Sequence, residues 1–263
     1  MDAPPVIPAE SIIDSHCHLT TYSDEELETV IEDAAAWGVT RIVSIGASEG
    51  TASAARSLAI AERFENVWST VGIHPHDAGK GWSLSEIESL AAEPRVVAIG
   101  ETGLDFFRDW SPFDAQERLF HEHIELAVSV GKPLIIHCRE ALEETISILE
   151  SSAARNVGGV FHCYAGDEEY AKRLARINFL VSFPGTVTFK KAQTVHAAAS
   201  AIPLSQMLVE TDTPYLSPEP RRGKQNHPKH TLFIAMKIAE LKGATLDEVA
   251  RQTSANAAAL FRL

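Results

Sequence analysis

The chain has 263 residues, 45% of them hydrophobic, which is enough to bury a large core. Its net charge of −13 excludes the broad basic surface of a typical nucleic-acid binder, so metal ions and a few local cations must hold any phosphate-bearing substrate. The sequence has no apolar run near the roughly 18 residues that suggest a membrane span. Residues 1–10 lack the basic cluster and apolar stretch of a signal peptide. Each of the three cysteines lies beside a histidine and fits a buried thiol better than a disulfide, so we expect a cytoplasmic protein.

Strand and helix patterns alternate along the whole chain. Short apolar segments predict buried strands ending near 13, 45, 72, 99, 136, 161, 183 and 209. Amphipathic patterns predict helices at 24–37, 50–64, 84–92, 112–130, 140–152, 168–176, 192–201, 231–241 and 246–263, the first with Asp24 as its N-cap. Eight such units predict one (β/α)₈ TIM-barrel domain over residues 1–263. A doubly wound open sheet is the alternative, but no glycine-rich phosphate motif follows the first strand.

Residues able to bind metal stand where the predicted strands end. His16 and His18 follow the first strand and share one face of it, because strand side chains alternate. The other candidates are Glu101 on the fourth strand, His137 on the fifth, His162 on the sixth and Asp212 on the eighth. The C-terminal ends of barrel strands meet on one face, so these four histidines and two carboxylates are expected to converge there.

Six ligands exceed what one metal ion needs, which predicts two divalent ions. Glu101 is the natural bridge between them, because it lies between the two histidines of the first strand and those of the fifth and sixth. The mixed nitrogen and oxygen set suits zinc, manganese, cobalt or iron(II) better than magnesium.

Cations and aromatic residues near these strand ends are candidates for substrate contacts. Arg139 can aim at an oxyanion at the metals, and His74 can contact substrate or a bound water. Further candidates are Arg108, Arg221, Arg222 and Lys224 for phosphate, and Phe106, Phe107, Trp110 and Tyr164 for stacking on a base. For each, the alternative is a solvated surface charge or an aromatic ring packed in the core.

Taken together, these motifs resemble the TatD family of metal-dependent deoxyribonucleases, within the amidohydrolase superfamily. The resemblance rests on IDSHCHL at 13–19, GIHPH at 72–76, GETGLD at 100–105, HCR at 137–139, HCYAG at 162–166 and ETDTPYL at 210–216. It implies a TIM barrel that holds two divalent metals, often magnesium, with the same six ligands, and a largely 3′-to-5′ exonuclease activity on DNA. Two positions depart from the family pattern, His227 where an acidic residue is usual and Glu140 where Asp is common.

Three hypotheses about function follow. The leading one is a 3′-to-5′ exodeoxyribonuclease in which Asp212 and Glu101 work with a metal-activated water, and Arg139 stabilises the developing charge. It predicts single-stranded DNA or its 3′ ends as substrate and favours a monomer. The second is an amide or ester hydrolase, such as an aminoacyl deacylase. The third is a metal-binding scaffold without turnover, which the complete ligand set disfavours.

Overall fold

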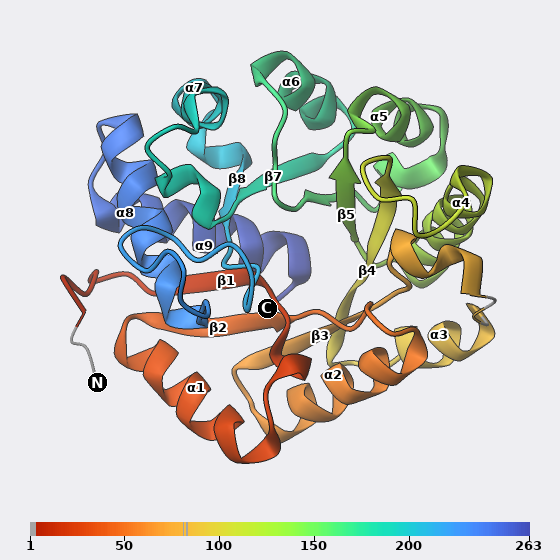
Figure 1. The fold of residues 1–263 in the computed structure, drawn as a ribbon, viewed down its shortest axis with the longest axis horizontal. Helices are drawn as coiled ribbons and strands as arrows, with labels where there is room; N and C mark the ends of the chain where they lie inside the picture. Colours follow the sequence, from red (N-terminus) through yellow and green to blue (C-terminus); the bar gives the residue numbers. More distant parts are fainter. Residues whose placement is uncertain (1–3, 81, 83) are drawn as a thin grey trace.

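The computed structural model describes residues 4–80, 82 and 84–263, so the first three residues of the segment searched for a signal peptide lie outside the described part. Eight parallel strands follow one another around a sheet in chain order (Figure 1). The strands are β1 (Ile12–Cys17), β2 (Val39–Ser44), β3 (Val67–Val71), β4 (Val96–Asp105), β5 (Leu134–Arg139), β6 (Gly159–Phe161), β7 (Phe179–Phe183) and β8 (Met207–Val209).

The sheet is closed by contacts between its first and last strands. A parallel bridge joins Cys17 to Thr213, just beyond β8. The backbone N–H of Asp212 donates to the carbonyl oxygen of His16, and that of His18 donates to Thr213, both over 2.9 Å. The predicted (β/α)₈ barrel is therefore confirmed, and the open sheet is excluded.

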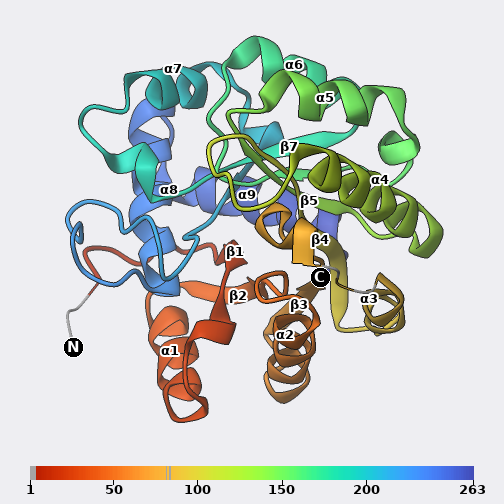
Figure 2. The same ribbon diagram turned by 45° about the vertical axis from the view of Figure 1, so that its right-hand side comes forward.

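Helices surround the strands on the outside of the barrel (Figures 1 and 2). They are α1 (Asp24–Ala36), α2 (Thr51–Arg63), α3 (Leu84–Ala91), α4 (Phe113–Val130), α5 (Leu142–Ser151), α6 (Glu168–Arg176), α7 (Gln193–Ala201), α8 (Thr231–Lys242) and α9 (Leu246–Phe261). The N-cap of α1 is Ser23 and not Asp24, because the Glu26 carboxylate accepts a hydrogen bond from the Ser23 N–H in a capping box. Among the described residues, no helix combines the length and the apolar character needed to cross a membrane.

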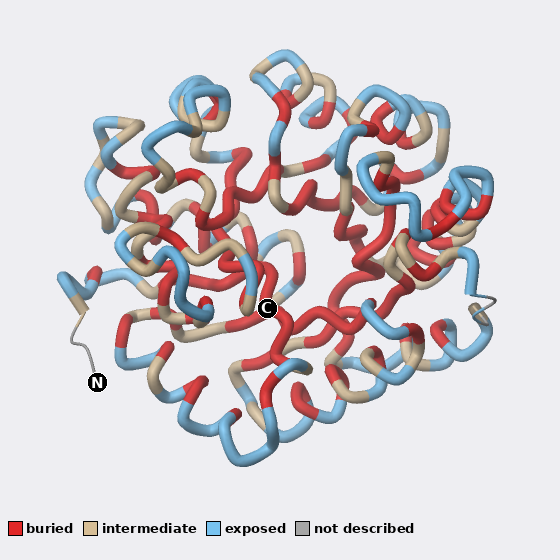
Figure 3. The backbone as a smooth tube through the Cα atoms, viewed as in Figure 1, coloured by how far each residue is buried: buried red, intermediate tan, exposed pale blue. Residues whose placement is uncertain are grey.

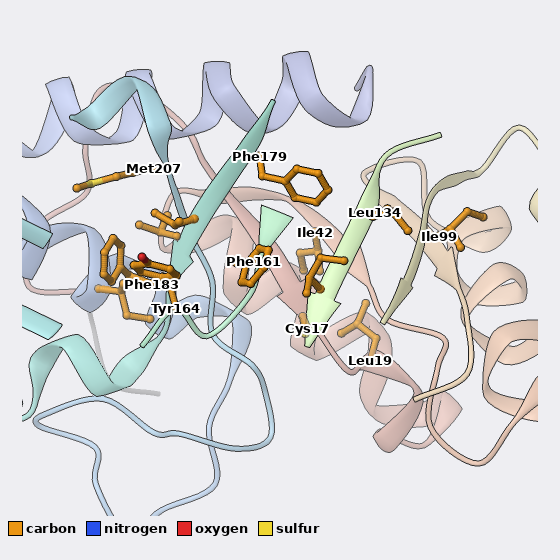
Figure 4. Close-up of a cluster of buried hydrophobic side chains, with 14 of the residues drawn as sticks. Cys17, Leu19, Ile42, Ile99, Leu134, Phe161, Tyr164, Phe179, Phe183 and Met207 are labelled. Carbon is orange, nitrogen blue, oxygen red and sulfur yellow. The ribbon is translucent and has the colours of Figure 1, made fainter. Parts of the chain in front are cut away.

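Buried residues follow the strands (Figure 3), and their side chains form two separate layers of the core. The larger layer fills the space between strands and outer helices, and part of it is shown in Figure 4. The smaller layer lies inside the barrel and includes Ile13, Ile135 and Val160, each the second residue of its strand. Phe261 of α9 joins this inner layer, so α9 closes the end of the barrel where the strands begin.

Strand β4 is longer than the predicted 96–99 and continues to Asp105. Its pairing with β5 shifts register between Ile99 and Thr102. Gly100 has a φ of +146°, and a Cβ there would lie 2.6 Å from the carbonyl oxygen of Ile135, so glycine is required where the two strands approach closely. The irregularity brackets Glu101 and interrupts the alternation of side chains along the strand.

Candidate metal centre

The structure brings all six predicted ligands together where the strands end. Each of the six lies in a strand or shortly after one. They are His16, His18, Glu101, His137, His162 and Asp212. All are buried except His137, which is partly buried. The barrel mouth therefore holds a compact cluster of four imidazoles and two carboxylates, assembled from segments far apart in the sequence.

Glu101 lies between two groups of imidazoles. Its Oε1 is 2.8 Å from both His137 Nδ1 and His162 Nε2. Its Oε2 is 3.4 Å from His16 Nε2 and 3.9 Å from His18 Nε2. A carboxylate with its two oxygens facing two sets of potential ligands has the arrangement needed to bridge two metal ions.

Asp212 completes the group around His16 and His18. Its Oδ1 lies 3.4 Å from His18 Nε2 and 3.7 Å from His16 Nε2. His16 is fully buried, yet neither of its ring nitrogens has a hydrogen-bond partner among the described residues. Buried polar atoms are normally satisfied, and a cation beside two carboxylates would satisfy this ring. The residues present therefore fit a metal site.

Among the groups of described side chains close enough to hold an ion, three overlap and consist only of the six predicted ligands. Within each set the donor atoms lie no more than 4.8 Å apart. The sets are His16, His18 and Glu101; His16, His162 and Asp212; and Glu101, His137 and His162. Imidazole nitrogens and carboxylate oxygens in these proportions suit zinc, manganese, cobalt or iron(II).

The two carboxylates are held in their charged form. Burial alone would raise the pKa of Glu101, but the surrounding imidazoles, led by His162 and His74, hold it well below its usual range. Burial would also raise the pKa of Asp212, but the hydrogen bond from His18 and the nearby imidazoles lower it. In return, the pKa of His162 is raised well above its usual value, because the Glu101 carboxylate outweighs burial. The centre therefore attracts cations, and protons compete with metals for its imidazoles.

His74 belongs to the group on the Oε1 side of Glu101. Its Nε2 is 3.4 Å from that oxygen and 3.3 Å from His137 Nδ1. Its Nδ1 accepts the backbone N–H of His76, which assigns the proton of the neutral ring to Nε2. Burial lowers the pKa of His74 to about 4. His74 is thus a neutral donor aimed into the centre.

Asp105 and His76 are functional candidates that the sequence analysis did not single out. The Asp105 Oδ2 accepts hydrogen bonds from His76 Nε2 at 2.7 Å and from His137 Nε2 at 3.0 Å. The bond to His137 leaves its Nδ1 facing Glu101, as a ligand requires. The available signal was that Asp105 and His76 each end one of the motifs, GETGLD and GIHPH.

Glu210 is a further carboxylate that the sequence did not single out, and the Cys163 thiol lies on the same side as the ligands. Glu210 is fully buried, and its Oε1 accepts the Cys163 N–H at 2.6 Å and lies 3.5 Å from His162 Nδ1. The alternation of side chains along a strand would point Cys163 away from its neighbour His162 and the other ligands, but its Sγ lies 3.9 Å from Asp212 Oδ2. Its φ of +49° breaks the strand alternation on which that expectation rested. Burial raises the pKa of this thiol, which keeps it a poor nucleophile.

Arg139 and Arg108 lie at the rim of the mouth. Arg139 is exposed, and its guanidinium carbon is 3.8 Å from the centroid of the Phe107 ring. The guanidinium carbon of Arg108 is 5.0 Å from the same ring and 5.1 Å from the Trp110 ring. The contact of Arg139 with an oxyanion therefore stays a prediction.

Arg221, Arg222 and Lys224 lie in the long loop after β8. Arg222 is exposed over the Phe189 ring, 4.1 Å from its centroid, Lys224 is exposed, and Arg221 is partly buried. Their predicted contacts with phosphate stay predictions. His227 in the same loop is partly buried, its Nδ1 accepts the Lys229 N–H, and burial lowers its pKa to about 4.

Tyr164 does not support the predicted stacking on substrate. Its ring is 3% exposed and packs beside Phe183 in the hydrophobic core (Figure 4). Its hydroxyl donates to the carbonyl oxygen of Asp167 at 2.6 Å. No free ring face is left for a base, and packing is the role that the structure gives this residue.

Comparisons with known proteins agree with this geometry. The family described as TatD related DNase matches residues 13–262. The uncharacterized metal-dependent hydrolase YabD of Bacillus subtilis is 42% identical over 255 residues, which cover 96% of this chain and 99% of the relative. A Cronobacter sakazakii protein named 3′-5′ ssDNA/RNA exonuclease TatD is 34% identical over 246 residues, or 90% of this chain and 92% of the relative.

A solved structure extends the likeness to three dimensions. The TatD homologue YjjV from Escherichia coli K12 superposes with a TM-score of 0.89 and 28% identity, covering 96% of this chain and 98% of that one. The family match spans the motifs that supply the barrel-mouth cluster. The chain therefore belongs to the family of TatD-related DNases and is a metal-dependent hydrolase.

Proposed function

We propose that the protein is a 3′-to-5′ exonuclease that hydrolyses phosphodiester bonds at the ends of single-stranded DNA. The observation that carries the proposal is the position of Glu101, whose two oxygens face two groups of imidazoles at the barrel mouth. Enzymes that cleave phosphodiesters commonly use paired metals to stabilise the attacking and leaving oxygens. The activity in the name of the Cronobacter sakazakii relative supports the same choice.

The residues that would hold two divalent ions divide into two sets. His16, His18 and Asp212 form one, His137 and His162 form the other, and Glu101 belongs to both. Metals bound there supply Lewis-acid stabilisation and a water molecule of lowered pKa. Zinc and manganese fit these donors better than magnesium.

Three side chains of the protein are assigned roles in the reaction itself. Asp212 is anionic at neutral pH, so it can accept the proton of the attacking water. His74 is a neutral donor and can hydrogen-bond a phosphoryl oxygen through Nε2. Arg139 supplies a rim cation that stabilises the negative charge developing on the phosphoryl oxygens while the 3′ oxygen of the remaining strand leaves. None of the three forms a covalent intermediate with the substrate.

The charge distribution favours attack at ends over attack within a strand. A net charge of −13 disfavours the long basic groove that tracks many phosphates. The candidate cations at the barrel mouth are enough to neutralise one or two backbone phosphates. Binding should therefore show a salt slope on the order of −1 to −2.

The test compares end-labelled linear single strands, a circular single strand and an aminoacyl ester, each incubated with protein reconstituted with manganese or zinc. We expect stepwise release of nucleotides from the 3′ end of the linear strand and an intact circle. Efficient cleavage of the circle would contradict the end-directed reaction. Hydrolysis of the ester with no hydrolysis of DNA would show that the centre catalyses amide or ester hydrolysis instead.

A further inference from the structure

Two aromatic rings and two arginines form an exposed patch on the loop between β4 and α4 and at the end of β5. We call it the aromatic–arginine patch, and its members are Phe107, Arg108, Trp110 and Arg139. Trp110 is 63% exposed and Phe107 is 46% exposed. Removing such rings from water is favourable, so a ligand that covers both rings gains binding free energy from their burial.

The patch alternates cations with π faces. The Arg139 guanidinium lies 3.8 Å from the Phe107 centroid, and Arg108 lies 5.0 Å from Phe107 and 5.1 Å from Trp110. Phe107 therefore positions both guanidinium groups, whereas most of the Trp110 surface stays open to solvent. A cavity of about 370 Å³ lies along the same loop and is lined by residues 109–113.

The aromatic–arginine patch is attached directly to the metal centre. The Trp110 and His76 rings contact each other edge to face, with their centroids 4.5 Å apart. The His76 and His137 ring centroids are 5.8 Å apart. The Asp105 carboxylate, which holds His137, also accepts the backbone N–H groups of Phe107 and Arg108 at 3.0 and 2.9 Å. One buried carboxylate thus fixes a candidate ligand and the start of the exposed loop together.

A largely exposed indole ring next to guanidinium groups matches one kind of ligand, an unpaired nucleobase with its backbone phosphate. Any base can stack on an aromatic ring, which makes such contacts tolerant of sequence. The local positive charge complements a polyanion that the rest of this acidic chain repels.

We propose that Trp110 is a base-stacking platform for single-stranded nucleic acid, with Arg108 and Arg139 pairing the adjacent phosphate. The inference rests on the proposed nuclease function, because it places the unpaired base next to the bond to be cut. It assigns Trp110 to substrate binding and Phe107 to positioning Arg139.

The experiment measures binding to the metal-loaded protein by fluorescence anisotropy. The probes are a labelled octathymidylate with phosphorothioate linkages, which resist cleavage, and an abasic strand of the same length and linkage. Trp110→Leu should weaken thymidylate binding about tenfold and leave the abasic strand nearly unchanged. Trp110→Phe should restore most of the affinity, and Arg139→Gln should weaken both strands.

Trp68→Leu is the matched control. Trp68 also carries an arginine over its ring, Arg95 at 5.0 Å, but it lies at the start of β3, at the end of the barrel away from the mouth. Thermal unfolding of both leucine variants reports whether each is folded. This control should bind both strands like the wild type.

The stacking proposal and the nuclease proposal fail in different ways. The stacking proposal is overturned if the Trp110→Leu variant binds thymidylate within twofold of the wild type. It is also overturned if this substitution weakens binding of the thymidylate strand and the abasic strand equally. The same holds if the wild-type protein binds neither strand. A Trp110-dependent preference for thymidylate without any release of nucleotides from ordinary DNA upholds stacking and refutes the nuclease.

Discussion

Replacing Glu101 with alanine is the sharpest test of the two-metal arrangement. Glu101 places an oxygen 2.8 Å from His137 and His162 and another 3.4 Å from His16, so its loss removes a donor from both sets. Asp212 faces one set, through His16 and His18. We expect Glu101→Ala to lower the metal content from about two ions per chain to well under one. Asp212→Ala should retain about one ion, bound by the other set.

Both variants should lose activity, because each removes a charged group from the reacting centre. Loss of one such group commonly costs about a hundredfold or more in turnover. Elemental analysis of protein purified without chelator gives the metal content, and initial rates on labelled oligonucleotides give the activity. Glu169→Ala is the matched control, since Glu169 is exposed on α6 and pairs with Lys172.

Two results would refute this reasoning. One is a Glu101→Ala protein that keeps two ions or works within tenfold of the wild type. The other is a wild-type protein that holds less than about half an ion per chain even after manganese or zinc is added, which would remove the two-metal arrangement itself.

Three further changes have defined outcomes. Asp105→Asn should weaken metal binding about 10- to 100-fold in a chelator competition, because His137 loses the acceptor that orients it, and unchanged affinity would contradict that role. Dialysis at about pH 5 should release metal that is retained at pH 7.5, because His162, whose pKa is raised, takes up a proton in place of the ion; metal retained at pH 5 would count against imidazole ligation. Burial lowers the pKa of His123 from 6.5 to about 4. As the pH falls from about 6.5 to about 4, the unfolded chain therefore binds a proton before the folded chain does, and the free energy of unfolding decreases by about 3 kcal/mol. Urea titrations should show this loss, and His123→Gln should show a flatter profile; equal profiles would mean that His123 does not titrate in this way.

Much of the fold and the ligand set could be predicted because local patterns report on them. Each strand is a short apolar run, and in a parallel barrel the residue that follows such a run lies at the mouth. His16, Glu101 and Asp212 could therefore be placed without knowing any distance. The length of β4 could not, since Gly100 and Gly103 interrupt its apolar pattern.

The supporting side chains were harder to find for a different physical reason. Asp105 and Glu210 act through contacts with residues distant in sequence. The sequence alone does not distinguish a buried carboxylate that accepts hydrogen bonds from one exposed to solvent. The direction of Cys163 depends on a positive φ that no periodicity indicates. Tyr164 follows a ligand and is aromatic, which suits stacking, but its burial beside Phe183 is set by the packing of β6 against β7.

The hydrogen bonds that close the barrel have a consequence for how activity is acquired during synthesis. They join His16 to Asp212 and His18 to Thr213, so the seam between the first and last strands is also part of the candidate metal centre. A growing chain carries its two N-terminal histidines long before the matching carboxylate leaves the ribosome. Such pairing is among the most non-local in the protein, so we expect it to form late, after the intervening β/α units have folded. We therefore expect the metal centre to be completed in one step, when the last strand docks, and chains that lack this strand to have no hydrolase activity.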